Sequence, residues 1–130
     1  MVGVLVVSHS RRLAQGACEL VGAMAKGVRL EWRGGEPPEL GVSVELVADA
    51  LEGLLEGGGE VVVVADLGSS VLAAEAAVEL IGAGPRVRVL RGVPMLEGFI
   101  AAAMALTVGG GLAEAVAAAE AACGALEGGR

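Results

Sequence analysis

The chain begins with Met1-Val2-Gly3-Val4-Leu5-Val6-Val7-Ser8-His9-Ser10-Arg11-Arg12, in which a β-branched apolar run is followed by three polar residues. A short, continuous apolar run is typical of a parallel strand that is buried on both faces. The residues after Ser10 have a helical pattern, so this segment predicts the strand, turn and helix of an α/β fold. His9 is then at the carboxyl end of the first strand, the edge of an open α/β sheet at which ligands bind.

The alternation of strand and helix continues along the chain. Four apolar runs have the length of strands: Val2–Val7, Val28–Trp32, Val61–Ala65 and Val87–Leu90. Five segments are predicted to be helical: Arg11–Lys26, Val44–Leu55, Ser69–Ile81, Leu96–Thr107 and Leu112–Leu126. Three glycine-rich tracts are predicted to be loops and helix ends: Gly34-Gly35-Glu36-Pro37-Pro38, Gly57-Gly58-Gly59 and Gly109-Gly110-Gly111. Strands that alternate with helices favour a parallel sheet with right-handed connections.

The second predicted strand differs from the first and third. Val28-Arg29-Leu30-Glu31-Trp32-Arg33 alternates apolar and charged residues, which is typical of a strand at an edge or with one wet face. The uninterrupted apolar runs of the first and third strands indicate burial on both faces. We therefore expect a doubly wound three-layer sandwich, a mainly parallel four-stranded sheet of order 2-1-3-4 flanked by about five helices.

Composition limits the partners and the location. At 130 residues, the chain is expected to be a single domain spanning residues 1–130. Nine basic and sixteen acidic residues give a formal net charge of −7, which repels a phosphate backbone and argues against a nucleic-acid partner. The longest apolar stretch, Phe99–Val108, is too short to cross a bilayer, and no signal peptide is evident. We expect a soluble, cytoplasmic protein with no membrane partner.

The sequence offers no metal-ligand or nucleotide motif. Cys18 and Cys123 are far apart in helical patterns, so we expect reduced, buried side chains. No G-x-x-x-x-G-K-[ST] motif follows a predicted strand, and the first strand-to-helix turn lacks G-x-G-x-x-G. The chain is therefore not expected to bind a nucleotide by itself, and neither a metal nor a cofactor is expected.

Asp66 follows the third predicted strand, in Ala65-Asp66-Leu67-Gly68-Ser69-Ser70. Neighbouring strands lie about 4.8 Å apart, so this carboxylate can reach the imidazole of His9. An aspartate that accepts the proton of one ring nitrogen leaves the other nitrogen free as a nucleophile. Gly68 is expected to allow a close backbone approach. The amides and hydroxyls of Ser69 and Ser70 are expected to donate to phosphate-like oxygens.

Simpler interpretations stay open for each of these residues. His9 can be a helix cap or a satisfied buried group, and the segment after Asp66 can be a turn that caps a helix. Arg11 and Arg12 fit first-turn surface positions, and Trp32 fits packing or the rim of a site. Three glutamates have the pattern of solvated helix faces: Glu75, Glu79 and Glu120.

Three motifs together resemble a known family. They are Val7-Ser8-His9-Ser10 with Leu13-Ala14 and Gly16, Asp66-Leu67-Gly68-Ser69 with Glu75 and Glu79, and Pro94-Met95-Leu96-Glu97-Gly98. In this order and spacing they resemble the phosphotransfer subunit of the phosphoenolpyruvate-dependent dihydroxyacetone kinases. That subunit is similar to the enzyme IIA domain of the mannose-type sugar phosphotransferase system, and the resemblance spans nearly the whole chain.

The resemblance implies a phosphocarrier with the same 2-1-3-4 sheet. The phosphocarrier protein HPr would phosphorylate His9 at the nitrogen that Asp66 does not hold. The acceptor would be ADP on a separate nucleotide-binding kinase subunit. Family members are usually homodimers. Because the chain ends at Arg130 without appended carrier domains, we expect the upstream donors to be separate proteins.

Backbone amides after His9 and around Gly68 are the expected donors to the phosphoryl oxygens. The expected phosphoryl-binding residues are Ser10, Gly68 and Ser69. The candidate residues of a rim that contacts partners are Arg11, Arg12, Trp32 and Met95.

Other functions remain open on the sequence. A mannose-type enzyme IIA would use the same chemistry but pass the phosphoryl group to an enzyme IIB, although the Asp66-Leu67-Gly68-Ser69 turn favours the kinase branch. A small tetrapyrrole metal chelatase also has a histidine after its first strand, but such sites generally need a further ligand, and this chain has one histidine. A histidine phosphatase needs a second catalytic histidine. A binding module would not need His9 at all.

Overall fold

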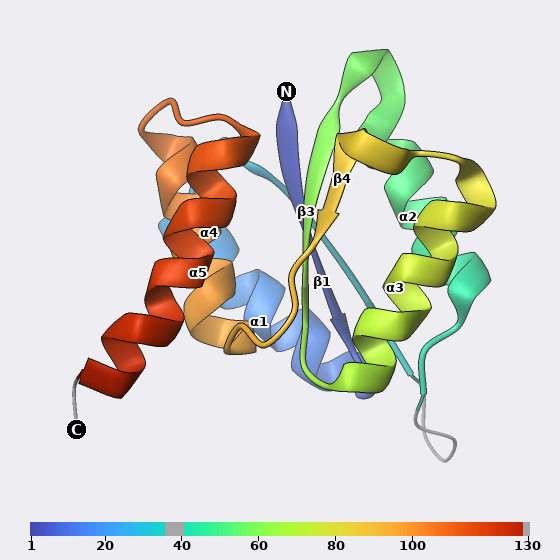
Figure 1. Cartoon of the computed structure of the whole chain (residues 1–130), viewed down its shortest axis with the longest axis horizontal. Coiled ribbons are helices and arrows are strands. Elements are labelled where there is room, and N and C mark those ends of the chain that lie inside the picture. Colours follow the sequence, from blue (N-terminus) through green and yellow to red (C-terminus); the bar gives the residue numbers. More distant parts are fainter. Residues whose placement is uncertain (36–40, 129–130) are drawn as a thin grey trace.

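The computed structural model describes residues 1–35 and 41–128, with side chains up to residue 122. Within these residues a four-stranded sheet is formed by β1 (Val2–Ser8), β2 (Arg29–Gly34), β3 (Glu60–Ala65) and β4 (Val87–Val89). All neighbouring strands pair in parallel, in the order β2-β1-β3-β4 (Figure 1). The predicted fold class and strand order are confirmed.

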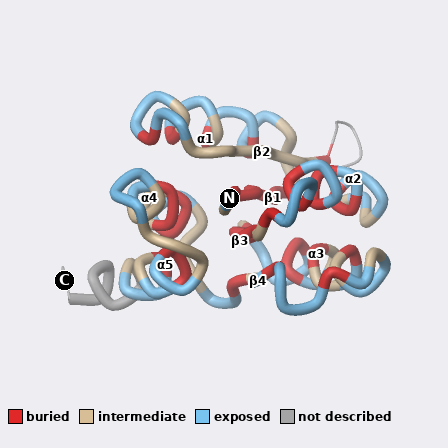
Figure 2. The backbone as a smooth tube through the Cα atoms, turned by 90° about the horizontal axis from the view of Figure 1, so that it is seen from above, coloured by how far each residue is buried: buried red, intermediate tan, exposed pale blue. Residues whose placement is uncertain are grey.

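Helices cover both faces of this sheet. They are α1 (Arg11–Met24), α2 (Val44–Leu55), α3 (Gly68–Ile81), α4 (Met95–Thr107) and α5 (Leu112–Gly128), with single 3-10 turns at Glu56–Gly58 and Gly84–Arg86. The helices α2 and α3 pack on one face, and α1, α4 and α5 pack on the other (Figures 1 and 2). None of the helices within the described residues is both long and apolar enough to span a membrane.

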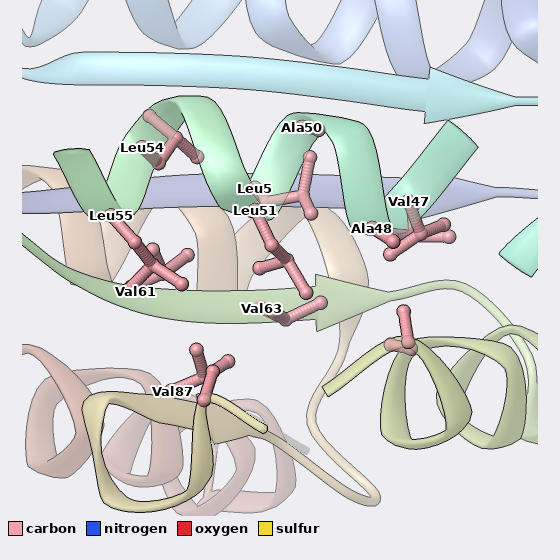
Figure 3. Close-up of a cluster of buried hydrophobic side chains, with 14 of the residues drawn as sticks. Leu5, Val47, Ala48, Ala50, Leu51, Leu54, Leu55, Val61, Val63 and Val87 are labelled. Carbon is pink, nitrogen blue, oxygen red and sulfur yellow. The ribbon is translucent and has the colours of Figure 1, made fainter. Parts of the chain in front are cut away.

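Two hydrophobic cores share the central strands. In β1, Leu5 points to the core under α2 and α3, whereas Val4 and Val6 point to the core under α1, α4 and α5. Figure 3 shows Leu5 of β1, Leu51 of α2 and Val63 of β3 together in the first core. This two-sided burial explains the continuous apolar runs within β1 and β3, while β2, at the edge, is only partly buried along its length.

The exit of β2 differs from the sequence-based expectation. Gly34 was expected in a loop, but it belongs to β2 and pairs with Ser8. A Cβ on Gly34 would lie 2.7 Å from the Cα atom of Arg11, so the missing side chain lets the start of α1 pack against the strand. The glycine provides space for close backbone packing and does not break the strand. The residues Glu36-Pro37-Pro38 of the expected loop lie outside the described part.

The cysteines were expected to be buried. Cys18 is only partly buried on α1 and has a free thiol. Burial raises the pKa of this thiol, and the nearby negative charges of Glu31 and Glu19 raise it further. The side chain of Cys123 lies outside the described residues.

Candidate functional site

The ends of β1 and β3 bring His9 and Asp66 together. Val7 pairs with Ala65, and the amide of Asp66 donates to the carbonyl of Val7 at 3.1 Å. His9 follows β1 and Asp66 follows β3, so both side chains leave the sheet at its carboxyl edge. The Nδ1 atom of His9 lies 3.3 Å from Oδ1 of Asp66, which is the contact that the strand order predicted.

Four donor groups surround the carboxylate of Asp66. The Ser8 hydroxyl and the His9 amide donate to Oδ2 at 2.8 and 3.0 Å. The Ser70 hydroxyl donates to Oδ1 at 2.7 Å, and the His9 ring approaches the same oxygen. Burial alone would raise the pKa of Asp66, but these hydrogen bonds outweigh it and lower the pKa below its ordinary value. Asp66 is therefore ionised at neutral pH and held in a fixed orientation.

The two ring nitrogens of His9 have different surroundings. Nδ1 faces Asp66 and the Ser70 hydroxyl, which lies 3.0 Å away. Nε2 faces the Ser69 hydroxyl at 2.6 Å, on the exposed side of the ring. A quarter of the His9 side chain is exposed. Because an ionised carboxylate only accepts hydrogen bonds, the proton of a neutral ring belongs on Nδ1, and the lone pair of Nε2 points outward.

The amides that follow His9 are used within the chain. The Ser10 amide donates to the Ser8 hydroxyl at 3.0 Å, and the Arg11 amide donates to the carbonyl of Gly35 at 2.7 Å. The Ser10 hydroxyl caps α1 by accepting from the amide of Leu13 at 3.3 Å. The amides of Ser10, Arg11 and Leu13 thus have partners within the chain, and phosphoryl binding by Ser10 stays a prediction.

The start of α3 is open. Leu67 is its N-cap residue and provides no side-chain cap. No hydrogen bond within the described residues engages the amides of Gly68 and Ser69, and both residues are exposed. A Cβ on Gly68 would meet no described atom within 4 Å, so no other part of the described chain packs closely on this glycine, and its close approach to a phosphoryl group stays a prediction. The free amides and the positive end of the helix dipole are suited to an anion beside Nε2.

Ser70 differs from its expected role as a phosphate donor. Its side chain is fully buried, and its hydroxyl contacts Asp66 and the Nδ1 side of His9. The spacing of buried residues along α3 could have predicted from the sequence that Ser70 points inward. Ser70 precedes the buried residues Ala74 and Ala77 by four and seven positions, so the three share the inward face of α3.

Comparison with known proteins shows the family to which the chain belongs. The model of the EIIA-man family, described as "PTS system fructose IIA component", matches residues 3–116. The chain belongs to this family. Relatives named "PEP-dependent dihydroxyacetone kinase, phosphoryl donor subunit DhaM" occur in Klebsiella michiganensis and Escherichia coli strain K12. The chain is 32% identical to each, over 86% and 84% of its own length. It spans about a quarter of the length of these relatives, 25% and 24%.

Solved structures agree with the EIIA-man fold. The crystal structure of the unknown-function protein EF1359 is similar with a TM-score of 0.81 and 26% identity, over 92% of this chain and 93% of that one. A DegV family protein from Thermus thermophilus, described as binding fatty acid, has a TM-score of 0.68 and 18% identity. The match covers 94% of this chain and 53% of that chain, and at this identity it concerns the fold alone.

The residues that the sequence indicated for a partner-contacting rim differ in exposure. Arg12 is exposed, whereas Trp32 and Met95 are partly buried against the core under α1, α4 and α5. Their contacts with partners stay predictions. Leu13 and Leu67 were not singled out as rim residues, yet both side chains are about half exposed, at 48% and 56%, next to the site in the sequence.

A cleft adjoins the site on the β4 side. It has a volume of about 240 Å³ and is lined in part by Asp66, Gly68 and Arg91. Arg91 donates to Glu75 of α3 through two nitrogens, at 3.0 and 2.5 Å. The Glu75 side chain is 35% exposed, which agrees with a solvated helix face, and its carboxylate is paired with Arg91 there. Among the described residues, no three His, Cys, Asp or Glu side chains gather as a set of metal ligands.

Proposed function

We propose that the chain is a phosphocarrier of a dihydroxyacetone kinase. It accepts a phosphoryl group from phospho-HPr on Nε2 of His9 and passes it to ADP on the nucleotide-binding kinase subunit. The observation that carries this proposal is the difference between the two ring nitrogens: Asp66 and Ser70 hold Nδ1, while Nε2 faces outward beside the open start of α3. The DhaM names of the relatives support the kinase branch.

The first transfer is an in-line displacement. The lone pair of Nε2 attacks the phosphorus of the donor's phosphohistidine, the bond from phosphorus to the donor nitrogen breaks, and the donor ring leaves with that electron pair. The His9 ring keeps its Nδ1 proton and gains a positive charge as the new N–P bond forms. The ionised carboxylate of Asp66 faces this charge and stabilises it without moving. The remaining task is to position the two rings and stabilise the transferred group.

The phosphoryl oxygens are held at the start of α3. The amides of Gly68 and Ser69 form the positive end of α3, where an anion is stabilised. The Ser69 hydroxyl, 2.6 Å from Nε2 in the resting state, turns from the nitrogen to a phosphoryl oxygen. Ser10 is the remaining candidate for contact with the group from the α1 side.

The second transfer reverses the roles. A terminal phosphate oxygen of ADP attacks the phosphorus, the bond to Nε2 breaks, and the electron pair returns to the ring. The products are ATP and the neutral Nδ1–H imidazole, so the site is ready for the next donor. The positive charge on the phosphorylated ring makes Nε2 a good leaving group, which suits a carrier that must release what it accepts.

Partner proteins need to approach His9 closely for both steps. The proposed contact rim contains Arg11 and Arg12 at the start of α1, together with Trp32 and Met95. A homodimer in the cytoplasm is the proposed assembly, by analogy with the family that the sequence resembles. HPr and the kinase subunit would use the same edge in turn, because Nε2 lies there beside the exposed Ser69.

A second candidate is the enzyme IIA of a sugar phosphotransferase system. The matching family model, described as a fructose IIA component of that system, favours it. Its first step would be identical, but the acceptor would be a residue of an enzyme IIB. The two candidates therefore differ only in the second transfer.

The first experiment is intact-mass analysis after incubation with phosphoenolpyruvate, enzyme I and HPr, with His9→Ala in parallel. We expect one acid-labile phosphoryl group on the wild type and none on the variant. The phosphorylated chain is then offered to an ADP-loaded kinase subunit or to an enzyme IIB, and the acceptor that removes the group identifies the branch. No addition to the wild type, with HPr from a compatible source shown to be phosphorylated, would contradict the carrier function.

A further inference from the structure

Ser70 lies closer to the inner ring nitrogen of His9 than Asp66 does. Its hydroxyl oxygen is 3.0 Å from Nδ1, whereas Oδ1 of Asp66 is 3.3 Å from the same atom. The hydroxyl is also 2.7 Å from Oδ1, and the Ser70 side chain is fully buried. Ser70 therefore bridges the carboxylate and the ring from beneath, out of reach of a phosphoryl group on the outer nitrogen.

The protons in this triangle have one consistent arrangement. A serine hydroxyl has a single proton to donate, and an ionised carboxylate only accepts. The Ser70 proton therefore goes to Asp66, and an oxygen lone pair of Ser70 faces Nδ1. If Nδ1 had no proton, its lone pair would face oxygen lone pairs of both neighbours. The Nδ1–H form satisfies all three groups, and Nε2 then accepts a hydrogen bond from Ser69.

We infer that Ser70 is a positioning residue that holds the His9 ring in the Nδ1–H tautomer, sharing the ring proton with Asp66 in a bifurcated hydrogen bond. The direct contact of 3.3 Å between Nδ1 and Asp66 is long for an N–H···O bond, and the Ser70 oxygen supplies the nearer acceptor. The kinetic consequence rests on the proposed phosphocarrier function, whereas the tautomer is a property of the resting protein.

Loss of the Ser70 hydroxyl has two effects on the ring. Nδ1 keeps only the long contact to Asp66, and Asp66 loses one of its four donors. The Nε2–H tautomer then becomes populated, and in that form the nitrogen that must attack phosphorus carries a proton. Only the fraction of molecules with a free Nε2 lone pair reacts. The loss of a hydrogen bond to a charged group slows phosphorylation about tenfold.

The test is to record ring ¹⁵N chemical shifts of His9 in labelled wild type, Ser70→Ala and Ser69→Ala, across pH. His9 is the only histidine of the chain, so both ring signals belong to it, and their couplings to the two carbon-bound ring protons distinguish Nδ1 from Nε2. We expect a protonated Nδ1 and an unprotonated Nε2 in neutral wild type. Ser70→Ala should move both shifts toward the values of a mixed tautomer. Ser69→Ala, which removes the hydroxyl on the opposite side of the ring, should keep the Nδ1–H pattern.

Wild-type ring shifts in a folded Ser70→Ala protein would overturn the inference. If that variant does not fold, Ser70→Cys is used instead, because cysteine has a similar volume and a weaker hydrogen-bonding group. Its ring shifts are compared with those of the wild type in the same way, and unchanged shifts would again overturn the inference. Phosphorylation rates with phospho-HPr are measured on the same proteins. A wild type that shows the Nδ1–H tautomer but takes up no phosphoryl group would refute the proposed function while the ring shifts still decide the role of Ser70.

Discussion

The carboxylate of Asp66 holds the residues of the candidate site in place through the hydrogen bonds that its two oxygens accept. Each of its oxygens accepts one serine hydroxyl and one nitrogen of His9. The two serines involved, Ser8 and Ser70, are fully buried. Protonation of this partly buried carboxylate would destabilise the folded state, because an added proton would face a donor. The same contacts therefore connect the chemistry of the ring with the stability of the fold.

The first prediction concerns the stability of the protein in acid. The hydrogen bonds lower the pKa of Asp66 in the folded state, so its ionised form stabilises the fold at pH values above the unfolded pKa of about 3.9. This contribution is lost as the pH falls through the lower, folded pKa. The difference in the free energy of unfolding between wild type and Asp66→Asn should be positive at pH 7 and should shrink toward pH 3.

Urea unfolding of both proteins at several pH values measures this difference. The other carboxyl groups titrate in both proteins, so their contribution cancels. A difference that stays constant over the whole range would show that the ionisation of Asp66 does not stabilise the fold.

The second prediction compares two serines on either side of His9. The Ser10 hydroxyl caps α1, so Ser10→Ala should lower the free energy of unfolding by about 1 kcal/mol. The exposed Ser69 caps nothing in the described structure and contacts Nε2, so Ser69→Ala should change stability by less than about 0.5 kcal/mol. Ser69→Ala should instead slow phosphorylation by phospho-HPr more than Ser10→Ala does.

Denaturant unfolding and phosphorylation rates on the same two variants provide the comparison. The opposite ranking, in which Ser10→Ala is the slower phosphoryl acceptor and Ser69→Ala the less stable protein, would place the phosphoryl group at the start of α1.

At the level of secondary structure elements, the two helix starts beside His9 have different environments. The start of α1 is covered by the end of β2, where the carbonyl of Gly35 accepts from the Arg11 amide at 2.7 Å. The start of α3 has no such cover, so its amides remain available. The carboxyl edge of the sheet thus has one helix start that supports the structure and one that is free for a ligand.

The third prediction tests the backbone packing at the exit of β2. A Cβ on Gly35 would lie 2.2 Å from the carbonyl oxygen of Gly41 and 2.4 Å from that of His9. Gly35→Ala therefore forces backbone apart and should destabilise the protein by about 3 kcal/mol. Gly16 lies on the exposed side of α1 and has no atom within 4 Å of its Cβ position, so Gly16→Ala should stabilise by about 0.5 to 1 kcal/mol.

Thermal and urea unfolding of the two variants give the answer. Because Gly35 packs on the carbonyl of His9, Gly35→Ala should also slow phosphorylation, whereas Gly16→Ala should not. Equal stabilities for the two variants would mean that the exit of β2 has room for a side chain.

The same elements show which parts of the fold and the site could be predicted from the sequence and which could not. Strand order follows from which apolar runs are continuous, and it was sufficient to bring His9 and Asp66 together. The packing of Gly34 under α1 depends on a contact between segments that are distant in sequence, so the pattern around it indicated a loop. The different roles of Ser69 and Ser70 depend on the rotation of α3 about its axis. Neighbouring residues on a helix point in directions about 100° apart, so two adjacent serines can have different roles.

For the whole molecule, the sheet connects two separate hydrophobic cores to one site. Leu5 and Val63 face the core under α2 and α3, and Val4 and Val64 face the core under α1, α4 and α5. Among the described residues, the buried side chains form two separate clusters on opposite faces of the sheet. The site lies at the end of β1 and β3, the strands that both cores hold in place.

The fourth prediction uses one fully buried valine in each core, Val47 of α2 and Val21 of α1. Val47→Ala and Val21→Ala remove the same two methyl groups, and each should lower the free energy of unfolding by about 1 to 3 kcal/mol. Because the two side chains belong to separate clusters on opposite faces of the sheet, the effects should add within about 0.5 kcal/mol in the double variant.

A double-mutant cycle by urea unfolding at neutral pH measures the coupling between the cores, and the slope of the unfolding curve tests whether they unfold together. The folded double variant should still take up a phosphoryl group at His9 at nearly the wild-type rate, because neither valine contacts the site network. A coupling energy well above about 0.5 kcal/mol would mean that a substitution in one core shifts β1 and thereby changes the packing of the other core. That shift would also move His9, so the phosphorylation rate of the double variant would fall with it.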